Sequence, residues 1–260
     1  MAIDYDKYLY SKTIHYISNS GKDERNKYRG GKAGDQTGHE WELKSWYDRP
    51  WSCVLRYPDD TVGLYIAKLS IEAALNNNIG YDQGQRGTYW AELKKVGYKP
   101  SAIKTKCEDD CTSGVSANVK AVGALLGLPK LENLPLCSSR NMRQEFTAAG
   151  FMRLTGSRYT ISPNYLLPGD ILLYEGHHAA ANVTFGKKVV TPTLGEEVEI
   201  TGKTVWIRQA PGIENPTVGL AHKGEKFKFA AEFDPKGNGW FGIKYNGDVA
   251  YVSAKYSRII

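Results

Sequence analysis

Residues 109–129, DDCTSGVSANVKAVGALLGLP, carry the best-marked helix of the sequence. Asp110 stands where an N-cap belongs, and Gly127 followed by Pro129 supplies the stop. Cys111 therefore falls in the first turn, where unpaired backbone N–H groups and the helix dipole favour an anion. This position predicts a thiol with a lowered pKa, suited to attack on an acyl carbon. Asp110 opposes that effect unless its carboxylate is committed to the cap.

Further helices and strands are predicted on both sides of this helix. The helices are expected over residues 59–78, 86–97 and 138–151, where apolar side chains recur at helical spacing. The strands are expected over residues 39–47, 51–57, 169–176, 178–186 and 187–193. Because a group of helices is followed by a run of strands, the order predicts an α+β domain.

A histidine at the start of one predicted strand is a candidate base. His178 precedes three alanines, so little crowds its ring and neighbouring elements can come close. A cysteine at a helix start and a histidine at a strand start are each usually structural when they occur alone. Together on this pattern, Cys111 and His178 indicate a thiol hydrolase, in which the imidazole activates the thiol.

Two segments combine an Asp-Cys pair that opens a helix with a Pro-Gly-Asp turn and a strand-opening His: DDCTSGV (109–115) and LPGDILLYEGHHAAANV (167–183). In this they resemble the NlpC/P60 superfamily of papain-like cell-wall peptidases. GGKAGDQTGHEW (30–41), WYDRPWSCVLRY (46–57) and NNNIGYDQGQR (76–86) are similar to blocks of endolysins from phages of Gram-positive bacteria. The resemblance implies a papain-like domain of helices and antiparallel sheet over residues 1–192.

The resemblance also implies roles for single residues. Cys111 would be the nucleophile and His178 the base. Tyr81 matches a tyrosine that the family places beside the site, although a half-buried structural aromatic fits the sequence equally well. His177, in the loop before the base, is a second substrate-binding candidate. Neither a metal nor a cofactor is implied.

The group that orients the base is not evident. The family usually places a His, Asn or acidic residue on the strand after the base, and residues 187–193, KKVVTPT, offer none. Asn182 lies four residues beyond His178, roughly 13 Å along a strand, too far for a direct contact. Asp35 and Gln36, in GDQTG, are the remaining candidates for orienting the base or donating to an oxyanion. The same five residues are also a good turn sequence.

The C-terminal part, residues 204–260, is expected to be a separate all-β module after a linker at residues 193–203. Five short alternating segments are separated by glycine turns, of which Asn246-Gly247 is the strongest hairpin indicator. GNGWFGIKYNGDVAYVSAKYS (237–257) is similar to bacterial SH3 (SH3b) wall-binding domains, which implies a small SH3-like barrel. Residues 203–260 hold nine Lys/Arg and five Asp/Glu. This basic excess suits anionic wall polymers, and no nucleic-acid-binding motif accompanies it.

Three other interpretations compete with a thiol hydrolase. Cys107, Cys111, His177 and His178 could bind zinc, but Cys-x3-Cys is not a usual spacing and adjacent strand residues point to opposite faces. A disulfide between Cys107 and Cys111 would block the nucleophile. The chain could also be a non-enzymatic wall-binding phage structural protein.

The sequence as a whole predicts a peptidoglycan hydrolase that cleaves an amide of the peptide stem or cross-bridge through a thioester. An N-acetylmuramoyl-L-alanine amidase of the same fold is the alternative. The N-terminus shows no apolar signal region, and no run of 18 apolar residues predicts a membrane span. We therefore expect synthesis in the cytoplasm and action on the wall after release, as for a phage endolysin.

Overall fold

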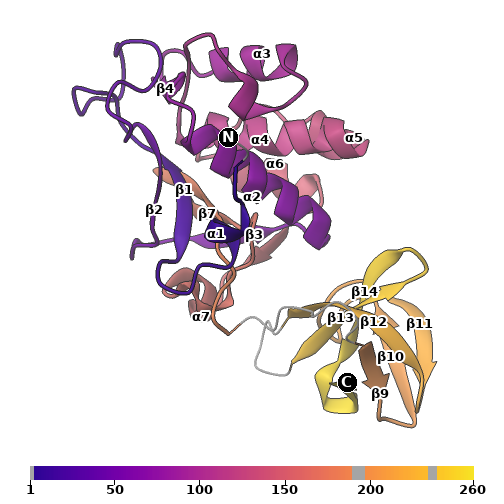
Figure 1. Ribbon diagram of the computed structural model, residues 1–260. Helices are drawn as coiled ribbons and strands as arrows, with labels where there is room; N and C mark the ends of the chain where they lie inside the picture. The colour runs from indigo at the N-terminus through magenta and orange to yellow at the C-terminus, as the bar shows by residue number, and fades with distance from the viewer. Residues whose placement is uncertain (1–2, 189–196, 234–238) are drawn as a thin grey trace. The chain divides into compact units, whose positions relative to one another are not determined.

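The computed structural model describes residues 3–188, 197–233 and 239–260, and the chain forms two compact units, Met1–Lys187 and Lys188–Ile260 (Figure 1). The first unit mixes helices with an antiparallel sheet, as the α+β prediction requires. The second is built mainly from strands. None of the helices in the described residues is long and apolar enough to cross a membrane.

Six strands form the sheet of the first unit, in the order β2-β1-β8-β7-β3-β6, and each neighbouring pair is antiparallel. Their bounds are β1 Tyr16–Ser20, β2 Trp41–Ser45, β3 Cys53–Arg56, β6 Met152–Leu154, β7 Ile171–Tyr174 and β8 His178–Asn182. The central strand β8 is buried along its whole length. Its three alanines allow the helices to approach the sheet closely.

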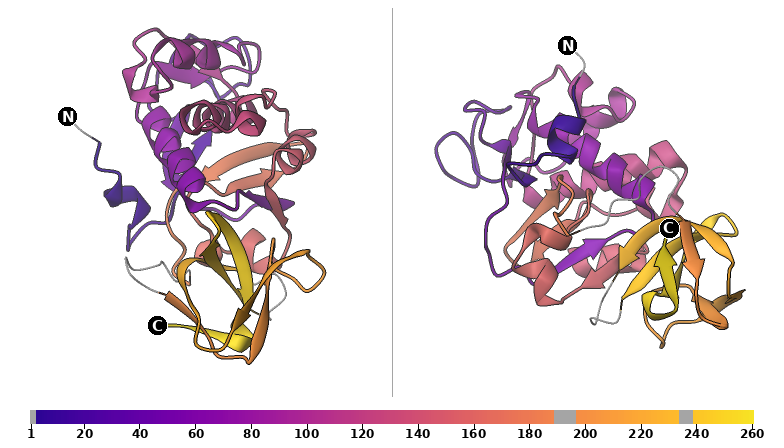
Figure 2. Two further views of the ribbon diagram at one scale, coloured as in Figure 1. Left: turned by 90° about the vertical axis from the view of Figure 1, so that its right-hand side faces the viewer. Right: turned by 60° about the horizontal axis from the view of Figure 1, so that its bottom comes forward.

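Two long helices, α2 (Asp60–Ala74) and α4 (Cys111–Leu126), pack on this sheet (Figure 2). Both contribute buried side chains to the main apolar core. The predicted caps of α4 are confirmed, since Asp110 accepts from backbone N–H groups at its start and Gly127 ends it in the left-handed conformation. At the start of α2, Asp59 accepts from the Thr61 N–H. The remaining helices are α1 Asp6–Leu9, α3 Thr88–Lys95, α5 Pro129–Glu132, α6 Met142–Ala148 and α7 Ser157–Thr160, with 3-10 turns at Pro100–Ala102, Pro163–Tyr165 and Ala254–Tyr256.

A second, two-stranded sheet leads into α4. Strands β4 (Ile79–Tyr81) and β5 (Cys107–Asp109) run parallel, with Tyr81 opposite Asp109. Cys107, which lies outside every strand and helix expected from the sequence, therefore belongs to a strand. Its side chain is buried in the main core, and it holds a strand position because β4 supplies the hydrogen-bonding partner.

The second unit contains a seven-stranded sheet in the order β11-β10-β14-β13-β12-β9-β15, with antiparallel neighbours. The strands are β9 Glu197–Ile200, β10 Thr204–Arg208, β11 Thr217–His222, β12 Lys226–Phe233, β13 Trp240–Tyr245, β14 Asp248–Ser253 and β15 Ser257–Ile259. The hairpin at Asn246-Gly247 is confirmed, with both residues at positive φ between β13 and β14.

Two sequence expectations differ from this arrangement or fall outside it. Residues 197–200, expected to belong to a linker, form β9, because β12 and the C-terminal strand β15 pair with it on either side. Of the strand expected at residues 187–193, Lys187 and Lys188 lie in a turn, and residues 189–193 are outside the described residues.

Candidate active site

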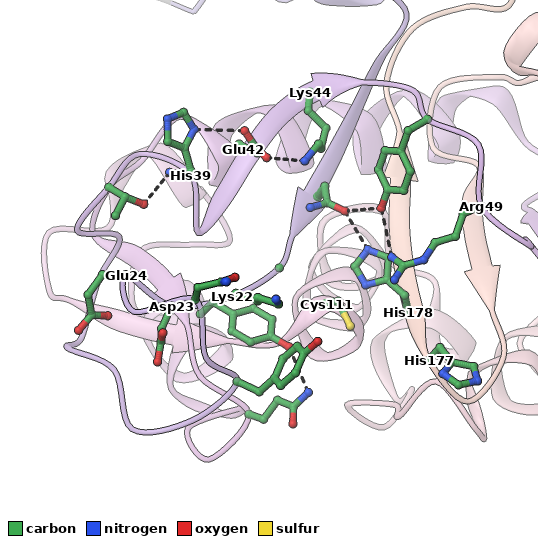
Figure 3. Close-up of a pocket in the computed structure, with 18 of the residues that line it drawn as sticks. Lys22, Asp23, Glu24, His39, Glu42, Lys44, Arg49, Cys111, His177 and His178 are labelled. Carbon is green, nitrogen blue, oxygen red and sulfur yellow. Dashed lines mark hydrogen bonds and ion pairs between the residues drawn. The ribbon is translucent and has the colours of Figure 1, made fainter.

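A pocket of about 590 Å³ opens over the first turn of α4 and the start of β8 (Figure 3). Cys111 and His178 both line it, so the structure brings the two residues together from elements far apart in the sequence. Tyr81 and His177 line the same pocket. Four of the six predicted site residues thus share one pocket.

The nucleophile candidate is positioned by the cap of α4. Asp110 Oδ1 accepts from the backbone N–H groups of Thr112 (2.9 Å) and Ser113 (2.7 Å), and the Asp110 carbonyl accepts from the Gly114 N–H (2.9 Å). Three of the first four N–H groups of the helix are therefore bound to Asp110. The N–H of Cys111 is not engaged by this cap.

The second carboxylate oxygen of Asp110 is occupied by Arg86. The Arg86 guanidinium donates to it through Nε, and also donates to Thr112 Oγ1 (3.2 Å) and to the Cys137 carbonyl. Burial alone would raise the pKa of Asp110, but the bonds from Arg86 and Ser113 outweigh it and hold the pKa below its ordinary value. Asp110 is thus an ionised cap, paired with a cation.

The thiol itself does not show the lowered pKa expected from its position. Cys111 is only 7% exposed, and burial, followed by the charge of Asp110, raises its pKa to about 12. The backbone N–H of Ala179 acts in the opposite direction but is a smaller effect. The prediction from helix position is wrong in sign because it omitted the cost of burying a thiolate, to which the charge of Asp110 adds although its carboxylate caps the helix.

His178 is held by an amide oxygen. Its Nε2 lies 2.8 Å from Asn19 Oδ1, which can only accept, so Nε2 carries the proton and Nδ1 keeps a lone pair. Burial, with the positive charges of Arg49 and Lys44, lowers the pKa of His178 to about 3. The ring also stacks on Trp51, with centroids 6.1 Å apart. Cys111 and His178 therefore line the pocket as a neutral thiol and a neutral imidazole.

Asn19 is a site residue that the sequence did not reveal. It lies on β1, and the register of β1 with β8, Ile17 opposite Asn182 and Ser18 opposite Ala181, puts its side chain on the face of the sheet that carries His178. Tyr47 donates its hydroxyl proton to the same Asn19 oxygen at 3.0 Å. No local motif marks Asn19, because the strand pairing that brings it to His178 is long-range.

Asn182, as expected from its distance, serves another purpose. Its Oδ1 lies 2.6 Å from His15 Nε2, and its amide nitrogen donates to the carbonyls of Leu167 and Thr184. Asn182 thus ties β8 to the segments before β1 and before β7, away from the imidazole of His178.

Tyr81 and His177 form two walls of the pocket. Tyr81 is 2% exposed, and its hydroxyl oxygen accepts from Gln83 Nε2 at 3.1 Å. Burial, with Cys111 as the next cause, raises the pKa of Tyr81, so its phenol is protonated and lies near the thiol. His177 is exposed and stacks on Tyr174, with ring centroids 4.2 Å apart.

The structure does not bring the other two candidates to the pocket lining. Asp35 accepts from the backbone N–H groups of Thr37, Gly38 and Glu40, which is the work of a turn. Gln36 Nε2 donates to two carbonyls of its own loop. Asp35 and Gln36 therefore stabilise the turn that the sequence GDQTG also predicted.

The described residues show neither a disulfide nor a cluster of metal-ligating side chains at the cysteines. All four cysteines are free and buried. Within residues 3–188, 197–233 and 239–260, no group of three or more His, Cys, Asp or Glu side chains could hold a metal ion.

The fold and pocket define an α+β domain in which a cysteine at a capped helix start and a histidine on an antiparallel sheet line the same pocket. The family model of the endolysin-like domain matches residues 17–189, which include both of these residues. The chain belongs to the endolysin-like domain family, and this membership associates it with bacterial cell-wall lysis of the phage endolysin type. No significant match to a curated protein is found.

Proposed function

We propose that the protein is a peptidoglycan amide hydrolase that uses Cys111 as nucleophile, His178 as general base and Asn19 as the residue that orients the base. The observation that carries the proposal is the bond from His178 Nε2 to Asn19, which leaves the Nδ1 lone pair for the thiol. The NlpC/P60-like architecture belongs to the same proposal. It is supported by a nucleophile at a helix start and a base on the adjoining antiparallel sheet.

The reaction starts from the neutral pair. His178 Nδ1 takes the thiol proton as the Cys111 sulfur attacks the acyl carbon, so no stable thiolate is needed beforehand. The resulting imidazolium gives the proton to the leaving amine, and a thioester remains. Water then attacks the thioester with His178 again accepting a proton, and the carboxylate product leaves with the thiol restored.

Two donors are proposed to hold the oxyanion. The Cys111 N–H is outside the Asp110 cap, and helix N-termini favour negative charge. Because Gln83 already donates to the Tyr81 oxygen, the Tyr81 O–H remains for a further acceptor in the pocket. This assigns to Tyr81 the donor role first considered for Gln36.

The second unit is proposed to be an SH3b-like wall-binding module. Trp206 on β10 and Leu220 on β11 are direct cross-strand partners, 55% and 40% exposed, and form an apolar surface patch. Leu220 also lines a pocket of about 380 Å³, together with Glu225, Lys226, Phe227 and Tyr245. Aromatic rings beside polar groups suit a mixed peptide and sugar polymer. The module would hold the enzyme on its substrate without taking part in the chemistry.

Digestion of purified peptidoglycan tests the proposal. Mass spectrometry of the products should show new amino termini with no new reducing sugar ends. Free amino termini within stem or cross-bridge peptides would identify an endopeptidase, and release of whole stems from the glycan would identify the amidase alternative. New reducing ends, or unchanged walls as for a purely structural wall-binding protein, would contradict the proposed chemistry.

A further inference from the structure

Arg49 lies directly beside the candidate base. It lines the same pocket, and its positive charge is among the causes of the lowered pKa of His178. The guanidinium packs over the rings of Tyr47 and Tyr174, 6.0 and 5.8 Å from their centroids, and Nη1 donates to the Tyr47 hydroxyl at 3.3 Å. Figure 3 shows His178 between Arg49 and Cys111. Arg49 is thus a held cation at the far side of the base from the nucleophile.

Most other charges of this pocket are compensated within the protein. Lys44 pairs with Glu42 at 2.8 Å, and Asp23 pairs with Arg25 at 2.7 Å. Glu24 lies 3.8 Å from Arg25 and accepts from a backbone N–H of its own loop. Within the residues that the structure describes, no carboxylate forms an ion pair with Arg49.

The unused donors of Arg49 suit a planar anion. A guanidinium has five N–H donors, and one is bound to Tyr47. Its remaining donors match a carboxylate, which guanidinium binds through two parallel hydrogen bonds. Because two rings already restrict the Arg49 side chain, little further ordering is needed when such an anion binds.

The position of Arg49 identifies the part of the substrate that it faces. In the proposed reaction the leaving amine takes its proton from His178, so the amine-bearing fragment must lie next to this ring. We propose that Arg49 binds a carboxylate on the leaving-group fragment. The inference rests on the proposed function. It selects amides whose leaving amine belongs to an amino acid or short peptide with a free carboxylate near that amine.

A pair of synthetic peptides tests this subsite with the full-length protein. Both contain the amide identified by the wall digestion, and the residue after it ends in a free carboxylate in one peptide and in a carboxamide in the other. The wild-type protein should cleave the carboxylate peptide with a kcat/KM about 10- to 100-fold higher. Arg49→Met should reduce this preference to within about threefold, and Arg49→Lys should retain part of it.

Tyr47→Phe separates substrate binding from positioning of the base. It removes the hydroxyl that joins Arg49 to Asn19 but keeps the Arg49 charge. Its kcat should fall equally for both peptides, with the carboxylate preference intact. The subsite is wrong if Arg49→Met also lowers kcat equally for both peptides and keeps the carboxylate preference. It is equally wrong if the wild-type protein cleaves the two peptides at the same rate or does not cleave the carboxylate peptide. Cleavage that survives Cys111→Ala overturns the proposed hydrolase as well.

Discussion

Asn19 on β1 and His178 on β8 are 159 positions apart in the chain, yet the amide oxygen and Nε2 lie 2.8 Å apart. The bond selects one tautomer of the imidazole and turns its basic nitrogen away from Asn19. The proposed orienting group therefore comes from a strand that precedes the proposed nucleophile in the chain. Family resemblance pointed instead to the strand after the base.

Removing the hydrogen bond between Asn19 and His178 should lower the rate of hydrolysis while Cys111 and His178 stay in the pocket. Asn19→Ala is expected to reduce kcat/KM on purified walls by roughly 100-fold, because the ring is free to turn. Asn19→Asp should behave differently. A carboxylate favours imidazolium, so it raises the pKa of His178 from about 3, and activity should be lost at a higher pH on acidification than in wild type. A pH profile of kcat/KM identical to wild type in Asn19→Asp would argue against the assignment.

The raised pKa of Cys111 predicts how the free thiol reacts. With a pKa of about 12, the thiolate fraction should rise about tenfold per pH unit between pH 6 and 9, and inactivation by iodoacetamide should follow it. Asp110→Asn keeps an N-cap but removes the adjacent negative charge, so its thiol should react faster at any given pH. A rate that is flat below pH 8 would instead indicate a preformed thiolate–imidazolium pair.

Gly114 is predicted to be required for folding of the nucleophile helix. A Cβ at this position would overlap the carboxylate of Asp109 and approach Trp41 Cη2 to 2.8 Å. Gly114→Ala should therefore lower the free energy of unfolding by about 1–3 kcal/mol. Gly87→Ala, at a helix N-cap with open space around it, is the matched control. Equal melting temperatures for the two variants would contradict the packing argument.

The exposed side chains of Trp206 and Leu220 on the second unit are expected to contribute to binding of the cell wall. Trp206→Ala in the full chain is expected to weaken sedimentation with purified walls about tenfold, while cleavage of a soluble peptide stays unchanged. Tyr256→Ala, another exposed aromatic of the same unit, serves as the control. Binding should also weaken with added salt if the basic excess contributes. Equal loss in both variants would place the binding surface elsewhere.

Local sequence was sufficient where local interactions decide the structure. The helix from Cys111 was predictable because its cap residue and its terminating glycine are both adjacent to it. The strands at Cys107 and at residues 197–200 were not predicted because each forms only through a partner that is distant in the sequence. Asn19 was not predicted as a site residue because its strand, too, pairs with a distant partner. The pKa of Cys111 was mispredicted because burial depends on the assembled core, which no local pattern records.

The central claim is that Cys111 carries the chemistry. The most direct test compares Cys111→Ala with Cys107→Ala, a buried cysteine four residues earlier that belongs to the core, in turbidity assays on purified cell walls. Cys111→Ala should lower the rate of wall clearing by at least about 1000-fold while still sedimenting with walls like wild type. Cys107→Ala should remain active. Clearing by Cys111→Ala within tenfold of the wild-type rate would contradict the account.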